Sequence, residues 1–406
     1  MDALITAAAR ALAAGDHLGA LNRVALRDDA PALALRGIAM ARLGDLGRAR
    51  TLLQSAARAF GSNETMARAR CILAEAEIAL VSRDLGWSAK TLGTARDTLE
   101  AHGDRVNSAH AQNLEARHLL LTGRLDEAER ALADIEPAQL PPALQATHHL
   151  TVAGIAIRRV RTESARAALS RADRAAAEAG IPALTAEIDS ASRALETPAA
   201  RLIRQNGERL ILLEQVEELM AAGSLVVDAC RYVVRTADTA VSLARRPVLF
   251  TLARTLGEAW PGDAPRDTLL HRAFRARQAD DSHRVRLRVE IGRLRAAMRG
   301  LAGISATKRG FTLTPYEARE VVVLAPPVED EHGRVLAFLS DGEAWSSSAL
   351  ALALGTSQRS VQRALDSLAA SGKAQSYGRG RARRWMTPPM PGITTTLLLP
   401  GPLPSG

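Results

Sequence analysis

The chain has 406 residues, of which 47% are hydrophobic, so we expect two or three packed domains. No run of about 18 apolar residues occurs and the first residues lack a basic, apolar leader, which excludes a transmembrane helix and a signal peptide. Residues 1–200 contain 24 basic and 24 acidic residues, whereas residues 201–406 contain 29 and 20, so the net charge of +9 lies in the second half and favours a nucleic-acid partner there.

The first 197 residues are rich in Ala, Leu and Arg and poor in β-branched and aromatic residues, a composition typical of helices. A short signal recurs in this part: a Gly or polar residue, Asp or Arg, an apolar residue, and then Ala. Its copies are separated by 29, 39, 40 and 37 residues, and each lies between two helical stretches. They are aligned on Asp16, Asp45, Asp84, Arg124 and Arg161.

This repeated helix–turn–helix pattern resembles tetratricopeptide-like repeats, which stack into an α-solenoid. The resemblance is partial, because the Trp and Tyr of that consensus are missing and Pro141-Pro142 interrupts one unit. It implies an array over residues 1–197 that binds a protein or peptide partner along one face. A purely structural body or a dimerisation platform is the alternative.

Residues 198–223 are expected to form one amphipathic helix that connects the array to the next domain. The apolar residues that predict it are Leu202, Leu210, Leu213, Val216 and Met220.

Residues 224–324 contain β-rich runs, three helical stretches and a short hairpin in that order. The runs are 225–228, 232–235 and 240–243, the helices 246–256, 265–276 and 281–299, and the hairpin 304–313. This succession resembles the OmpR/PhoB type of winged-helix DNA-binding domain, and it implies that the third helix enters the major groove of double-stranded DNA.

The third helix has one apolar face, formed by Leu287, Ile291, Leu294 and Met298 at spacings of 4, 3 and 4. The stretch 272–309 holds eleven Lys or Arg against three acids, an excess that a polyanion relieves. Arginine suits a phosphate or the edge of guanine, and a valine suits a thymine methyl. The outward candidates for DNA contact are Arg286, Arg288, Val289, Arg293 and Arg295, with Lys308 and Arg309 in the hairpin.

The segment 289–295 is similar to the recognition-helix core of that family. The similarity implies base contacts by Arg288, Val289 and Arg293 and a phosphate contact by Arg295. The sequence departs from the family at Gly292, where a polar side chain is usual, and in the hairpin, which has one glycine instead of two. The alternative is a winged helix used only for protein contacts.

After a linker at 325–333 that is rich in Pro and acidic residues, residues 334–387 predict a second winged helix-turn-helix. Helices are expected at 334–339 and 347–354, the latter closed by Gly355, and Thr356 or Ser357 caps a third. The segment 350–365 resembles the helix-turn-helix of many bacterial regulators. Its DNA-contact candidates are Ser357, Gln358, Arg359, Gln362 and Arg363.

Residues 373–385 predict a β-hairpin whose tip carries arginines for a minor-groove or phosphate contact. These candidates are Arg379, Arg381, Arg383 and Arg384. We expect Trp385 to anchor the base of the hairpin. A hairpin that is merely solvated is disfavoured, because no acidic residue lies within 373–387. Residues 388–406 form a Pro- and Gly-rich tail.

No catalytic constellation is evident, and we expect no enzyme. The Gly-x-x-x-x-Gly-Lys phosphate loop and Cys-x-x-Cys or His-x-x-x-His spacings are absent, so no cofactor and no metal site are expected. The adjacent His148 and His149 point about 100° apart on a helix and do not suit one metal ion.

Together these patterns predict a mainly α protein with an α-solenoid followed by two winged helix-turn-helix domains. The expected function is a sequence-specific, double-stranded DNA-binding transcriptional regulator of bacterial type, in which the array senses or docks a partner. Cys71 and Cys230 suit free thiols in the cytoplasm, and we expect the protein at the nucleoid, with no membrane partner. A homodimer is compatible. The alternatives are a protein scaffold and a nucleic-acid-binding accessory subunit without sequence preference.

Overall fold

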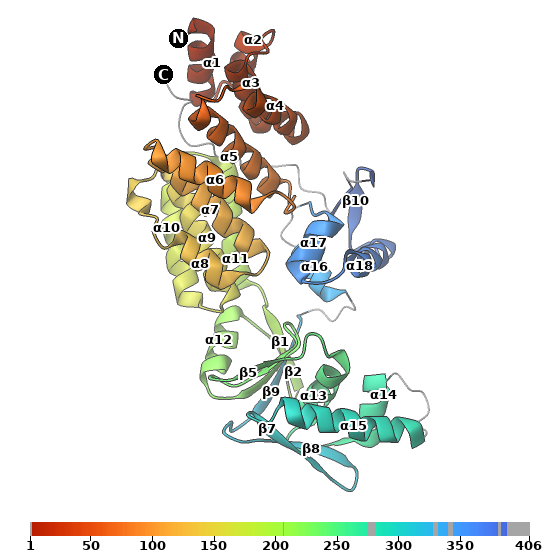
Figure 1. The fold of residues 1–406 in the computed structure, drawn as a ribbon. Coiled ribbons are helices and arrows are strands. Elements are labelled where there is room, and N and C mark those ends of the chain that lie inside the picture. Colours follow the sequence, from red (N-terminus) through yellow and green to blue (C-terminus); the bar gives the residue numbers. More distant parts are fainter. Residues whose placement is uncertain are drawn as a thin grey trace. The chain divides into compact units, whose positions relative to one another are not determined.

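The computed structural model is mainly helical and describes residues 2–205, 207–274, 281–327, 332–339, 344–380 and 383–387 (Figure 1). It divides into two compact units. Unit 1 comprises Met1–Arg158, Glu163–Ser192 and Arg334–Gly406, and unit 2 comprises Arg159–Thr162 and Arg193–Gly333. None of the described helices is both long enough and apolar enough to cross a lipid bilayer.

Residues 3–196, here called the helical array, form helices joined in antiparallel hairpins. Each hairpin buries small and branched apolar side chains between its two helices, and Gly37 lies where a Cβ would come within 2.8 Å of Leu53. The helices are α1 (Ala3–Ala13), α2 (His17–Val24), α3 (Ala30–Arg42), α4 (Leu46–Ala59), α5 (Thr65–Val81), α6 (Ala89–Ala101), α7 (Arg105–Leu121), α8 (Leu125–Leu132), α9 (Pro142–Arg158), α10 (Thr162–Ala179) and α11 (Pro182–Glu196), with a 3₁₀ turn η1 (Pro137–Gln139).

The repeated sequence signals lie in the turns of these hairpins. At the first one, Gly15 has φ 81°, and the N–H groups of Gly15 and Asp16 donate to the carbonyls of Leu12 and Ala11. This pair of bonds is a Schellman motif, which closes α1. The Asp16 carboxylate then accepts the N–H of Gly19 at 2.8 Å and caps α2. The Gly-Asp dipeptide therefore ends one helix and begins the next.

The same pair of carbonyl bonds closes α3, α5 and α7. The alanine four residues after each aligned Asp or Arg is buried in four copies: Ala20, Ala49, Ala128 and Ala165. The copy at Asp84 differs, because residues 82–88 form a longer turn, α6 begins only at Ala89, and Leu92 takes the buried place.

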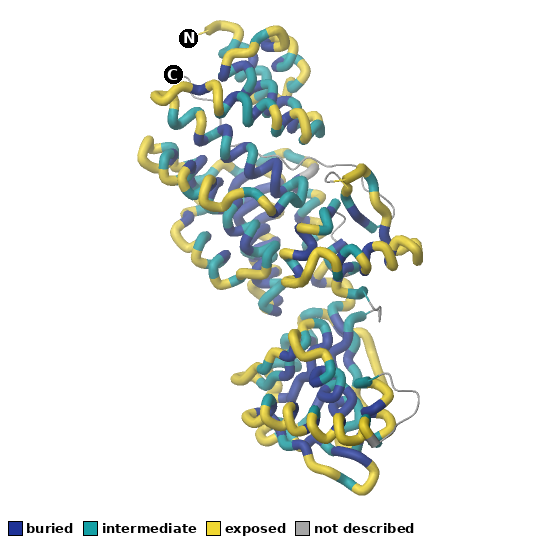
Figure 2. The backbone as a smooth tube through the Cα atoms, turned by 45° about the vertical axis from the view of Figure 1, so that its right-hand side comes forward, coloured by how far each residue is buried: buried dark blue, intermediate teal, exposed yellow. Residues whose placement is uncertain are grey.

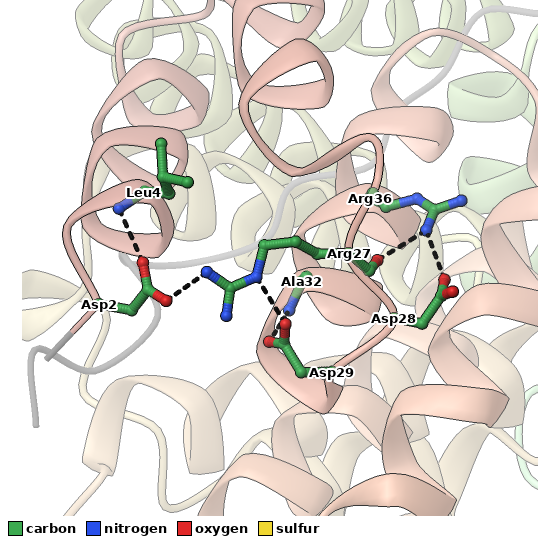
Figure 3. Close-up of polar contacts among 7 residues, drawn as sticks. All are labelled: Asp2, Leu4, Arg27, Asp28, Asp29, Ala32 and Arg36. Carbon is green, nitrogen blue, oxygen red and sulfur yellow. Dashed lines mark hydrogen bonds and ion pairs between the residues drawn. The ribbon is translucent and has the colours of Figure 1, made fainter.

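A network of charged side chains fastens the first hairpin to α3 (Figure 3). The guanidinium of Arg27 pairs with Asp2 and donates to Asp29 at 2.6 Å. Arg36 donates to the carbonyl of Arg27 at 2.9 Å and to Asp28 at 3.1 Å. Asp2 caps α1 and Asp29 caps α3, so the network joins helix ends.

Unit 2 contains a six-stranded sheet in the order β2-β1-β9-β3-β4-β5, in which β3 and β9 are parallel and the other neighbours antiparallel. Its strands are β1 (Ala200–Arg204), β2 (Gly207–Ile211), β3 (Leu225–Asp228), β4 (Val233–Arg235), β5 (Ala240–Ser242) and β9 (Val321–Ala325).

The expected single helix over 198–223 is wrong: this segment forms the hairpin β1–β2 and the short helix α12 (Leu213–Ala221). Buried residues in β1 alternate with period 2, and the sequence places an Asn-Gly dipeptide, a strong hairpin signal, at 206–207. Leu210, expected on the apolar face of the helix, is exposed on β2. The spacing of the apolar residues alone did not distinguish the 3.6-residue period of a helix from the 2-residue period of a strand.

Helices cover both faces of the six-stranded sheet, which explains why β9 is a continuous apolar run. Val226 and Val322 lie in one cluster with Val216 of α12, and Val227 and Val323 lie in another with residues of α13 (Pro247–Ala259). In Figure 2 this centre of unit 2 is buried.

The rest of unit 2 is built from α13, β6 (Asp263–Pro265), α14 (Arg266–Phe274), α15 (Asp281–Ala297), β7 (Ala302–Ala306) and β8 (Gly310–Pro315). The strands form a second sheet in the order β6-β8-β7, so the strand between the first two helices pairs with the hairpin after the third.

Residues 334–387, the C-terminal module, repeat this plan within unit 1. Trp345 lies between the first two helices and pairs with Trp385 in the hairpin that follows the third. Its elements are α16 (Gly333–Leu339), α17 (Ser347–Leu354), α18 (Gln358–Ala370), β10 (Gln375–Tyr377) and β11 (Arg384–Met386). The tail 388–406 lies outside the described residues.

Candidate nucleic-acid interface

Helix α15 packs its apolar stripe into unit 2 and turns the opposite face outward. Leu287, Ile291, Leu294 and Met298 are all buried in the cluster that also contains residues of α13 and β8. This is the face that the 4, 3, 4 spacing predicts. The five candidate residues on α15 that were expected to point outward are all exposed.

The exposed face of α15 is part basic and part apolar. The guanidinium of Arg286 lies over the ring of Phe274, 4.6 Å from its centroid, and Arg293 pairs with Glu290 at 2.8 Å. Val285 and Val289 are 56% and 49% exposed. A Cβ on Gly292 would meet no atom within 4 Å, so the backbone of α15 is open to close approach at this position.

Arg295 connects α15 to the hairpin β7–β8. Its Nε donates to the carbonyl of Ile304 at 2.7 Å, so the guanidinium fixes the first hairpin strand against the helix. The phosphate contact that the family resemblance implies for Arg295 would have to use the rest of this planar group.

The turn of the hairpin β7–β8 carries Lys308 and Arg309, both exposed. Arg266, the first residue of α14, donates to the carbonyls of Lys308 and Thr307, both at 2.9 Å. The Thr307 hydroxyl donates to Asp263 at 2.7 Å and accepts the N–H of Gly310 at 2.8 Å. These bonds fix the backbone of the turn, and the two basic side chains project from it.

Sequence reasoning missed Arg266 as a member of this site. Its position at the start of a helix gave no sign of a contact with residues about 40 positions later. A detectable signal was Ala264-Pro265, the dipeptide directly before Arg266. These residues belong to β6, which passes so close to Gly310 that a Cβ at position 310 would overlap the carbonyl of Ala264.

Helix α18 of the C-terminal module begins and is oriented as its sequence predicts. Gly355 ends α17 with φ 61°, and the Ser357 hydroxyl caps α18 by accepting the N–H of Ser360 at 3.2 Å. Val361, Leu365 and Leu368 are buried, whereas Gln358, Arg359 and Arg363 are exposed and Gln362 is half-buried.

Two of the polar candidates on α18 also contact neighbouring side chains. Gln358 donates to the hydroxyl of Ser347 in α17 at 3.0 Å, and Gln362 donates to Asp366 at 2.9 Å. The exposed arginines, Arg359 and Arg363, are four residues apart and therefore lie on one face of the helix.

The hairpin β10–β11 carries the remaining candidates. The guanidinium of Arg383 lies 4.3 Å from the ring centroid of Trp385 and donates to Ser376 at 3.2 Å. Trp385 is buried, which confirms its expected role as the anchor of the hairpin. Arg379 is exposed and Arg384 half-buried, while Arg381 lies outside the described residues.

The sequence candidates thus gather into two groups, one in each unit. In unit 2, α15 and the turn of β7–β8 lie on connected elements, and in unit 1 so do α18 and β10–β11. Beside the first group, a shallow pocket is lined by the start of α13 and by Glu290 and Arg293. Among the described residues, no three His, Cys, Asp or Glu side chains gather as metal ligands would.

Comparison of the chain with models of known protein families, with curated proteins and with solved structures gave no match.

Proposed function

We propose that the chain is a double-stranded DNA-binding transcriptional regulator with two winged-helix modules, one in each unit. The common plan of residues 247–315 and 334–387 supports this assignment. In both, a strand position between the first two helices pairs with a hairpin that follows the third helix. This is the order of elements in which winged helices present a recognition helix and a wing.

The main support is the coincidence of basic, exposed side chains on the third helix and on the hairpin of both modules. Arg288 and Arg293 on α15 stand with Lys308 and Arg309, and Arg359 and Arg363 on α18 stand with Arg379 and Arg383. Glu290 and Asp366 are the acidic residues on the same two helices that contact candidates. Such paired basic surfaces suit the groove and the flanking phosphates of a duplex.

For the helical array we propose a solenoid of tetratricopeptide-like hairpins that docks a protein or peptide partner. The repeated Schellman turn followed by an N-cap supports it, because stacked hairpins of this kind form extended surfaces. Residues 1–200, which include the array, carry no net charge, so the array is not expected to bind DNA itself.

Selection from a random duplex library with the full chain, at about 0.15 M salt and with excess competitor DNA, tests the proposal. We expect enrichment of a bipartite motif with one half for each module. Retention of DNA without any motif would contradict sequence-specific regulation and favour an accessory subunit without sequence preference. Absence of retention would contradict DNA binding altogether.

A second candidate function, a protein scaffold, is favoured by one observation. Val285 and Val289 on α15 and Leu352 on α17, which is 54% exposed, place apolar side chains on or near the proposed DNA-binding faces. The salt dependence of binding separates the two functions. A DNA binder loses affinity with a log–log slope near −0.9 per phosphate contact, whereas a scaffold binds little duplex near physiological salt.

A further inference from the structure

The turn between α5 and α6 differs at one backbone position from the α1–α2, α3–α4 and α7–α8 turns, whereas the α9–α10 turn also has a non-glycine residue with positive φ, Val160. The residue after the C-cap is Gly15, Gly44 and Gly123 in three turns, each with positive φ, but it is Arg83 here, with φ 50°. The carbonyl bonds are otherwise the same. A residue with a Cβ adopts this left-handed conformation at a cost, which favourable contacts of the Arg83 side chain can offset.

Arg83 contacts the C-terminal module. Its guanidinium lies over the ring of Trp345, 5.4 Å from the centroid. A second arginine at the same edge of the array does the same: Arg158, the last residue of α9, lies over Phe338 at 5.6 Å. The rings of Phe338 and Trp345 themselves pack edge to face at 5.5 Å. Two cations of the array therefore cover one aromatic pair of the module.

Apolar packing accompanies these cation–π contacts. Leu73 and Leu80 of α5 belong to the same buried cluster as Val335, Leu339 and Trp345 of the module. Gln358, Arg359 and Arg363 of α18 remain exposed. The array thus contacts the module on a surface other than its exposed basic face.

The contacted tryptophan is connected to the hairpin of the module. Trp345 exchanges two backbone hydrogen bonds with Trp385, and the guanidinium of Arg383 lies over the ring of Trp385. A continuous series of contacts therefore runs from the α5–α6 turn to a basic side chain of the hairpin β10–β11.

We propose that Arg83 and Arg158 form a docking site on the array for the C-terminal module, and that Arg83 is a positioning residue for the DNA contacts of that module. A partner that binds the array near α5 and α6 would then change how firmly the module is held. The docking part stands independently, and the DNA part rests on the proposed function.

Distance measurements between spin labels test the docking without DNA. Cysteines replace the exposed Arg130 on α8 and Ser367 on α18 in the full chain, with Cys230→Ser, while the buried Cys71 is left in place. We expect one narrow distance distribution for this parent. The variant Arg83→Gly/Arg158→Ala should add a broad component, with the ratio of docked to undocked module lowered roughly 5- to 30-fold.

Arg83→Gly places in this turn the glycine that the α1–α2, α3–α4 and α7–α8 turns have, so the array itself should fold normally. Arg58→Ala is the matched control, because the Arg58 guanidinium donates to the carbonyl of Gln54 in its own helix. Arg83→Lys in the Arg158→Ala background should restore much of the narrow component, since lysine also forms cation–π contacts. The docking site is overturned if the double variant keeps the narrow distance distribution of the parent both without urea and in urea just below the unfolding transition.

Footprinting on duplexes selected by the parent tests the positioning role. We expect the double variant to protect the half-site of α18 more weakly and that of α15 as before. Broadened distances with unchanged protection of both half-sites would overturn the role of Arg83 in DNA contacts but not the docking. If the parent selects no DNA, the proposed function fails, and the distances still decide the docking.

Discussion

Trp345 and Trp385 donate their backbone N–H groups to each other's carbonyl oxygens, both at 2.8 Å, and both indole rings are buried. Ala264 and Phe311 are paired at the corresponding place in unit 2. In each case the pairing ties the segment between the first two helices to the hairpin after the third. The hairpin is therefore held in a fixed position relative to the helix that precedes it, as the proposed two-point binding to a groove and its flanking phosphates would require.

Replacing Arg288 and Arg293 by alanine is expected to remove sequence preference at one half-site. Each arginine that contacts a guanine edge contributes about 1–3 kcal/mol of discrimination. Competition between the selected duplex and point-substituted duplexes measures the loss. Arg209→Ala, which removes an exposed arginine on β2, is the control. Equal preference in the double variant and the parent would rule out this face of α15 as the base-contacting surface.

Replacing Lys308 and Arg309 by alanine is expected to weaken binding to all duplexes about equally, because the turn of β7–β8 would contact phosphates. The slope of log affinity against log salt should fall by about 1 for each lost contact. Titrations between roughly 0.05 and 0.3 M salt measure this slope. A slope identical to that of the parent would place the turn outside the interface.

Arg266→Ala is expected to loosen the turn of β7–β8 without unfolding unit 2, since one of the two lost hydrogen bonds is exposed and the other is only partly buried. Amide exchange of residues 307–310 should accelerate, and duplex affinity should fall as it does in the Lys308→Ala/Arg309→Ala double variant. Arg266→Lys should not rescue either effect, because an ammonium lacks the planar fork that reaches two carbonyls. Normal exchange in Arg266→Ala would show that the two hydrogen bonds of the Arg266 guanidinium do not hold the turn.

The stability of the array is expected to decrease below pH 6.5. Burial, with smaller contributions from His149 and Arg171, lowers the pKa of His148 to about 4. The unfolded chain then binds a proton that the folded one does not, so stability is complete above pH 6.5 and declines as the pH falls toward 4. The loss is up to roughly 3 kcal/mol.

Urea unfolding at pH 7 and pH 4.5 measures this loss, and His148→Gln should reduce the difference between the two values. The neighbouring His149, whose pKa is lowered by burial and by Arg171 and Arg174, leaves part of the dependence in the variant. If the free energy of unfolding changes by the same amount between pH 7 and pH 4.5 in the parent and in the variant, His148 titrates alike in the folded and unfolded chain.

The elements that the sequence predicted well are those whose signals are local. Capping residues such as Ser357 and Gly355, and the 4, 3, 4 stripe of α15, depend on neighbours within a few positions. The predicted strands and helices between 225 and 313 therefore agree with the structure to within a few residues. Gly-Asp dipeptides located the hairpin turns of the array for the same reason.

The features that the sequence did not reveal depend on distant partners. The local Asn-Gly dipeptide at 206–207 indicates only the hairpin β1–β2, whereas the place of β1 inside the sheet depends on the pairing of Leu202 with Leu324, more than 100 residues later. The contact of Arg83 with Trp345 and that of Arg266 with the turn at 307–309 are hidden in the same way. Of the candidate site, the residue types and their outward direction were predictable, but the bonds that hold them were not.

The place of β9 between β1 and β3 has a consequence for the order in which the chain acquires its structure during synthesis. Hairpins of the array bury their apolar surface against sequence neighbours, so they can form one after another as the chain emerges. Strand β1 must wait for β9, its partner on one side, until residue 325 has left the ribosome. We expect a nascent chain arrested near residue 300 to hold a folded array and a protease-sensitive segment after residue 200.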